Sequence, residues 1–154
     1  KKSQVCGLYA GTRVDEVDEH VFKRSSRINS TWGGNLVDMV RSRRFIEIIK
    51  EDGLERNTLE RGEQVVAGLR AIAKETGAFH NVRGVGSLVA FSFEDPKARD
   101  EMVRSLHRQK VLALPCGTHS VRFRLPLTAT SEEADLLLER TATATPAAAA
   151  AAPA

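Results

Sequence analysis

Val121-Arg122-Phe123-Arg124-Leu125 alternates apolar and basic side chains without a break. This alternation predicts a β-strand whose apolar side chains point to one face and whose two arginines share the other face. The strand therefore predicts a sheet that buries one side.

Two further segments predict strands of the same sheet. Residues 87–93 are apolar and rich in β-formers, and they are entered through the glycine pair of residues 83–86, which we interpret as a tight turn. Residues 111–115 form a short apolar run. We expect a small α/β layer of three strands with helices packed on one face.

Four segments carry the spacing and the end signals of helices. They begin after Gly33-Gly34-Asn35, at Asn57, after Asp95-Pro96 and at Thr130. We expect the first to stop at Asp52-Gly53 and to be apolar on several sides, as in a large domain or a subunit interface. We expect the second to end at Gly77 and to carry one apolar stripe, as a helix covering a sheet does.

The buried face of the third helix is predicted from its spacing to consist of Ala98, Met102 and Leu106. In the last helix, Glu133 stands three residues after Thr130, and this pattern predicts a capping box. We expect leucines 136–138 to supply the buried side chains of that helix.

Composition excludes several classes of protein. The chain has 154 residues, and its 23 basic residues are interleaved with 20 acidic ones for a net charge of +3, so no basic stripe predicts nucleic acid binding. No apolar run reaches the ~18 residues of a membrane span. Cys6 and Cys116 lie far apart, so neither a disulfide framework nor a metal site is indicated, and a cytoplasmic setting fits best.

The two ends of the sequence differ from its middle. Lys1-Lys2-Ser3-Gln4 has neither an initiator Met nor a signal peptide, and we expect a chain truncated at its N-terminus. Residues 141–154 are rich in alanine, threonine and proline, and we expect a disordered, solvated tail there.

Asn29-Ser30-Thr31-Trp32-Gly33-Gly34-Asn35 combines hydroxyl side chains with glycines just before a predicted helix. Hydroxyls, bare backbone amides and a helix N-terminus all favour an anion such as a phosphate. The same residues would also serve as a simple turn and N-cap.

Four motifs, taken in order, resemble the C-terminal part of the class III aminotransferases that use pyridoxal phosphate. They are residues 1–7, residues 29–35, Arg83-Gly84-Val85-Gly86 and residues 121–127. The likeness runs from residue 1 to about residue 140 and implies part of an α/β fold of type I. It also implies three regions: the end of the large cofactor domain (1–60), the small C-terminal α/β domain (61–140) and the tail (141–154).

The resemblance implies roles for individual residues. Lys1 matches the lysine that holds pyridoxal 5'-phosphate as a Schiff base and moves a proton, with Lys2 as the alternative. Thr31, with Ser30 beside it, matches the contact to the cofactor phosphate across a homodimer interface. Arg122 matches the arginine that binds the substrate carboxylate with two parallel hydrogen bonds, and Arg124 could support it through an ion pair. The family usually has proline where this chain has Leu125, which could change how the strand ends.

The reaction implied is transfer of the ε-amino group of L-lysine to 2-oxoglutarate, giving glutamate and 2-aminoadipate 6-semialdehyde. Members that use 4-aminobutyrate share most of these motifs and remain an alternative. We expect no turnover from this chain alone. Two alternatives that are not enzymes also remain. The chain could be an inactive remnant, or an interaction module that binds an acidic partner through Arg41, Arg43 and Arg44.

Overall fold

The computed structural model describes residues 10–28, 31 and 33–145. The chain divides into two units, Lys1–Asp52 and Gly53–Ala154, and each is described by itself. These compact units meet at residues 52 and 53, and the second helix lies over its whole length in the second unit. The domain boundary near residue 60 stays a prediction.

The first unit contains a short 3-10 helix, η1 (Thr12–Glu16), and the helix α1 (Leu36–Glu51). The side chain of Asn35 caps α1 by accepting hydrogen bonds from the backbone N–H of Val37 at 3.0 Å and of Asp38 at 3.3 Å. The predicted start and end of this helix are confirmed. No residue of α1 is buried within its unit, so its apolar side chains are left exposed on several sides.

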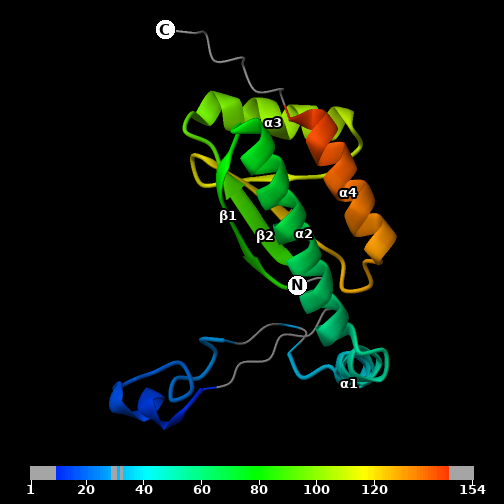
Figure 1. Ribbon diagram of the computed structural model, residues 1–154. Coiled ribbons are helices and arrows are strands. Elements are labelled where there is room, and N and C mark those ends of the chain that lie inside the picture. Colours follow the sequence, from blue (N-terminus) through cyan, green and yellow to red (C-terminus); the bar gives the residue numbers. More distant parts are fainter. Residues whose placement is uncertain (1–9, 29–30, 32, 146–154) are drawn as a thin grey trace, which may run out of the picture. The chain divides into compact units, whose positions relative to one another are not determined.

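The second unit is a four-stranded antiparallel sheet with three helices. Its elements are α2 (Leu54–Thr76), β1 (His80–Val85), β2 (Leu88–Ser92), α3 (Pro96–Arg108), β3 (Leu114–Cys116), β4 (Ser120–Arg124) and α4 (Ser131–Ala144). The strand order is β1-β2-β4-β3, which places β4 between β2 and β3. Figure 1 shows the three helices gathered on one side of the sheet.

The core lies between that side of the sheet and the helices. Val89 and Phe91 of β2 and Val121 and Phe123 of β4 are at most 2% exposed, and Leu69 of α2 and Leu106 of α3 pack with them. The Phe91 ring lies 4.5 Å from the ring of Phe79, between centroids. The predicted layer with helices on one face is confirmed, and we call the other side the open face of the sheet.

The sequence missed β1. We interpreted residues 83–86 as a turn, but Arg83, Gly84 and Val85 pair with Ala90, Val89 and Leu88 of β2, and only Gly86, with φ of 55°, lies in the turn. Gly84 is a glycine for a different reason, since a Cβ there would run into the backbone of Leu88 and Val89. The strand predicted at 111–115 begins later than expected, at Leu114. Val111 instead follows the end of α3, and its N–H donates to the Leu106 carbonyl at 2.9 Å.

The structure corrects two predictions about helices, the start of α2 and the buried face of α3. The second helix begins at Leu54 after Gly53, which has φ of 61°, so Asn57 lies inside it and is not its N-cap. Asn57 instead donates to carbonyl groups of a distant loop, a tertiary contact that no local pattern reports. Gly77 does end this helix, as predicted. In α3, Met102 and Leu106 are buried as expected, but Ala98 is exposed.

The capping box that starts α4 is confirmed at Thr130 and Glu133. The helix continues through Ala144, however, into residues that we assigned to a solvated tail. Thr141 and Ala144 are buried there, and Ser105 of α3 donates to the Ala144 carbonyl at 3.0 Å. Small side chains permit this close approach of two helices, so weak hydrophobicity did not mean exposure. Residues 146–154 of the predicted tail lie outside the described residues.

Candidate carboxylate site on the open face

The residues that the sequence singled out are distributed over both units. Lys1, Lys2 and Ser30 lie outside the described residues. Thr31 belongs to a turn in the first unit and is exposed, while Arg122 belongs to β4 in the second unit. A candidate site can therefore be built from the structure around Arg122.

Arg122 stands on the open face of the sheet. Its neighbours Val121 and Phe123 point into the core and are 0% and 2% exposed, so the predicted alternation of β4 is confirmed. Arg122 is half-buried, and it pairs in register with Ala90 of β2 on one side and Leu114 of β3 on the other. Both neighbours are apolar, so Arg122 is the polar side chain of these three that can bind a ligand.

The Nε atom of Arg122 is shielded from solvent and has no hydrogen-bond partner in the part of the chain that the structure describes. A buried donor without a partner is costly, by about 1–3 kcal/mol, and a bound anion would remove that cost. Arg122 also forms no ion pair with a described carboxylate, so its charge is available to a ligand.

The missed strand β1 brings a second arginine to this face. Arg83 pairs in register with Ala90, which itself pairs with Arg122, so Arg83, Ala90 and Arg122 form one row across three strands. Sequence reasoning failed to place Arg83 because Gly84 interrupts the alternation of its strand. In the structure only Val82 of this strand is half-buried and the apolar Val85 is exposed, so no alternation of apolar and polar residues marked the strand.

A pair of buried serines lies beside this row. Arg83 Nη1 donates to Ser92 Oγ at 3.0 Å and Nη2 donates to Ser120 Oγ at 3.1 Å, and the two hydroxyls are 2.9 Å apart. Both serines are at most 9% exposed. Each buried hydroxyl thus has two partners, the Arg83 guanidinium and the other serine.

Arg124 occupies the next open-face position along β4, opposite Leu88. It is exposed, and it forms no ion pair among the described residues, so the suggested supporting ion pair is absent from that part of the chain. The strand positions of the open face carry Arg83, Arg122 and Arg124 and no carboxylate. This face is consequently a positive surface suited to a carboxylate ligand.

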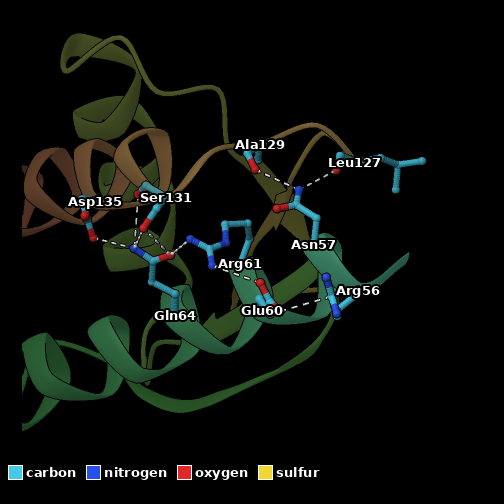
Figure 2. A network of polar contacts seen from close by, with 9 residues as sticks. All are labelled: Arg56, Asn57, Glu60, Arg61, Gln64, Leu127, Ala129, Ser131 and Asp135. Carbon is cyan, nitrogen blue, oxygen red and sulfur yellow. Dashed lines mark hydrogen bonds and ion pairs between the residues drawn. The ribbon is translucent and has the colours of Figure 1, made fainter. Parts of the chain in front are cut away.

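The loop that follows β4 is tied to α2 by the polar network of Figure 2. Asn57 Nδ2 donates to the carbonyls of Leu127 at 2.8 Å and of Ala129 at 3.0 Å. Two turns further along the same helix, Gln64 Nε2 donates to Ser131 and to Asp135 Oδ1. These contacts hold the chain just after the strand that carries Arg122.

The arginines of α1 are engaged within their own helix. Arg41 contacts Asp38 at 3.3 Å, Arg43 contacts Glu47 at 2.8 Å, and Arg44 contacts Glu47 and Glu51 at 3.3 and 3.2 Å. Hydrogen bonds from Arg43 and Arg44 lower the pKa of Glu47, and those from Arg44 to Glu51 and Glu47 raise the pKa of Arg44. The interaction-module alternative, which needs free cations here, finds no support.

The described residues contain neither a metal-binding cluster nor a membrane-crossing helix. No group of three or more histidine, cysteine, aspartate or glutamate side chains in that part of the chain is arranged to hold a metal ion. In the same residues, no helix combines the length and the apolar character that a membrane crossing requires.

Comparison with known proteins identifies close relatives. The family model described as Aminotransferase class-III matches residues 8–145. The L-lysine-epsilon aminotransferase of Mycobacterium tuberculosis is 45% identical over 95% of this chain. A solved structure of lysine aminotransferase from M. tuberculosis superposes with a TM-score of 0.79 at 44% identity, over 93% of this chain and 33% of that one. A 4-aminobutyrate aminotransferase of Schizosaccharomyces pombe is 31% identical over 72% of this chain and 24% of its own length.

The chain spans about a third of the length of the curated relatives it matches. The structural similarity confirms the predicted fold class, since the chain corresponds to part of the α/β fold of type I aminotransferases.

Proposed function

We propose, because this chain belongs to the class-III aminotransferase family, that its two units are the end of the large cofactor domain and the small C-terminal domain of a pyridoxal-phosphate enzyme. The proposed reaction transfers the ε-amino group of L-lysine to 2-oxoglutarate, giving glutamate and 2-aminoadipate 6-semialdehyde. Support comes from relatives named for the lysine reaction, which are 45% identical, against 31% for a 4-aminobutyrate aminotransferase.

The observation that carries the proposal is that Arg122 has an unpartnered, shielded donor among the described residues. Its guanidinium lies on a positive face without a carboxylate among the strand positions, and its shielded Nε lacks a partner in the described part of the chain. A planar guanidinium binds a carboxylate through two parallel N–H donors. We assign Arg122 the substrate carboxylate of 2-oxoglutarate and of glutamate.

The cofactor would be held by residues of the first unit. Lys1, or Lys2 in its place, would hold pyridoxal 5'-phosphate and would move the proton between substrate and cofactor with its amine. Thr31 and Ser30 would donate to the phosphate, a role that fits the exposed turn of Thr31 beside the N-terminus of α1. When bound, the cofactor supplies an electron sink for the carbon that loses its proton.

The partner assignment follows the same resemblance. We propose a homodimer in which Thr31 reaches the cofactor of the other subunit, in a cytoplasmic protein. We also propose that the 154 residues alone do not turn over, since they span a third of the length of their relatives.

The proposal is tested in a full-length protein that contains this sequence, assayed with 2-oxoglutarate and either L-lysine or 4-aminobutyrate. We expect turnover with L-lysine and formation of glutamate. Arg122→Lys should raise the KM for 2-oxoglutarate about a hundredfold, because a bidentate charged contact is lost. Arg104→Lys on α3, which pairs with Glu101, is the matched control and should leave the KM unchanged.

Turnover with 4-aminobutyrate and none with L-lysine would replace the preferred donor with the alternative one. Absence of turnover with either donor, in a folded protein that binds the cofactor, would favour an inactive remnant.

A further inference from the structure

Arg83 and Arg122 share the open face of the sheet but have different surroundings. Only the small side chain of Ala90 separates them in their row, and each strand step is about 4.8 Å, so their Cα atoms lie roughly 10 Å apart. The Arg122 Nε has no partner in the described residues, whereas Arg83 donates three hydrogen bonds. The two arginines are therefore suited to different tasks.

The contacts of Arg83 link three strands. Nη1 donates to the Asn81 carbonyl of its own strand at 2.9 Å and to Ser92 of β2, and Nη2 donates to Ser120 of β4. Ser120 begins β4 and stands two residues before Arg122 on the same face. Arg83 thus holds β4 from the side on which Arg122 emerges.

The charge of Arg83 also affects the surroundings of Arg122. Two guanidinium groups on one face repel each other, and the serine hydroxyls hold Arg83 in the neighbouring row. The Arg122 Nε has no partner among the described residues, and it lies in a positive potential to which Arg83 contributes. Both effects favour a carboxylate at Arg122.

We propose that Arg83 is a positioning residue for the carboxylate site: through Ser92 and Ser120 it holds β4 so that Arg122 presents its donors to a dicarboxylate. The inference rests on the proposed function of Arg122, and it adds a residue from the strand that sequence analysis missed.

The test uses a full-length protein that contains this sequence and two measurements by nuclear magnetic resonance. The first follows the Nε–H signal of Arg122, assigned with Arg122→Lys, and the second follows the same signal during titration with glutarate. Arg83→Met should move the Arg122 signal and weaken glutarate binding about tenfold, since hydrogen bonds that fix the strand and one nearby charge are lost. Arg104→Met removes an arginine of α3 and should change neither measurement.

A second variant covers the case in which Arg83→Met does not fold. Ser120→Ala keeps the charge of Arg83 but removes its contact to β4, and it should also move the Arg122 signal and weaken glutarate binding. Arg83→Lys, which keeps only the charge, should restore less than half of the loss in binding free energy.

An unchanged Arg122 signal together with unchanged glutarate affinity in folded Arg83→Met would overturn the positioning role while leaving the proposed function intact. Failure of the unmodified chain to bind glutarate would count against the function proposed for Arg122. In that case the response of the Arg122 signal to Arg83→Met still decides whether Arg83 positions it.

Discussion

Gly62 of α2 lies directly against the backbone of Gly86 in the turn between β1 and β2. A Cβ at Gly62 would overlap the Gly86 carbonyl group, so this helix can cover the sheet so closely only with glycine at position 62. The contact fixes α2 to the hairpin that carries Arg83.

Gly62→Ala is expected to lower the free energy of unfolding by about 1–3 kcal/mol, because overlap with a backbone outweighs the gain of up to ~1 kcal/mol in helix propensity. Gly68→Ala is the matched control, since the atoms nearest to its methyl group would belong to the side chain of Leu138, which can change rotamer. Urea unfolding measures both. A Gly62→Ala chain at least as stable as the unmodified one would contradict this packing.

Variants of Asn57 distinguish whether its side chain caps the helix or makes a tertiary contact. Asn57→Asp keeps a good N-cap residue but replaces the Nδ2 donor with a carboxylate facing the carbonyls of Leu127 and Ala129. We expect Asn57→Asp to cost about as much stability as Asn57→Ala, roughly 1–3 kcal/mol, and to speed hydrogen exchange in the loop before α4. Full stability of the aspartate variant would restore the cap interpretation.

Phe91 is 0% exposed and its ring packs against Phe79, Phe93 and Phe123. Phe91→Ala should cost about 3–5 kcal/mol, because a large cavity is left among side chains that cannot collapse into it. Val85→Ala on the open face, where Val85 is 79% exposed, should cost little. Thermal unfolding of the two variants compares the faces, and similar losses would mean that the open face is also part of a core.

Glu101 makes part of the stability dependent on pH. Hydrogen bonds from Arg108 and then from Arg104 lower the pKa of its carboxyl group. A carboxyl with a lowered pKa in the folded state stabilises above its ordinary pKa of about 4.3 and loses that contribution as pH falls through the lowered value. Glu101→Gln should therefore be less stable than the unmodified chain near pH 7 and equal to it in strong acid.

The effect of Glu101 is expected to be small, because its two ion pairs are exposed to solvent and screened by salt. Glu139→Gln serves as the control, since Glu139 has no ion pair among the described residues. A Glu101→Gln difference that stays constant from pH 7 to strong acid would mean that the ion pairs of α3 do not contribute.

Much of the second unit could be predicted from the sequence because its signals are local. The alternation around Arg122 depends only on the two-residue period of a strand, and Thr130 with Glu133 closes its hydrogen bonds within one helical turn. The family likewise follows from short motifs in order, and with it the proposed roles of Lys1, Thr31 and Arg122.

Only the tertiary structure decided where long-range contacts overrule these signals. Arg83 joins the open face because β1 pairs with β2 across a turn at Gly86, although the glycines around it suggested a turn alone. Asn57 is not a cap, because the Leu127 carbonyl, seventy residues away, accepts a hydrogen bond from its side-chain amide at 2.8 Å. Thr141 and Ala144 are buried because α3 lies beside them, and neither pairing nor packing between distant segments is written in local propensity.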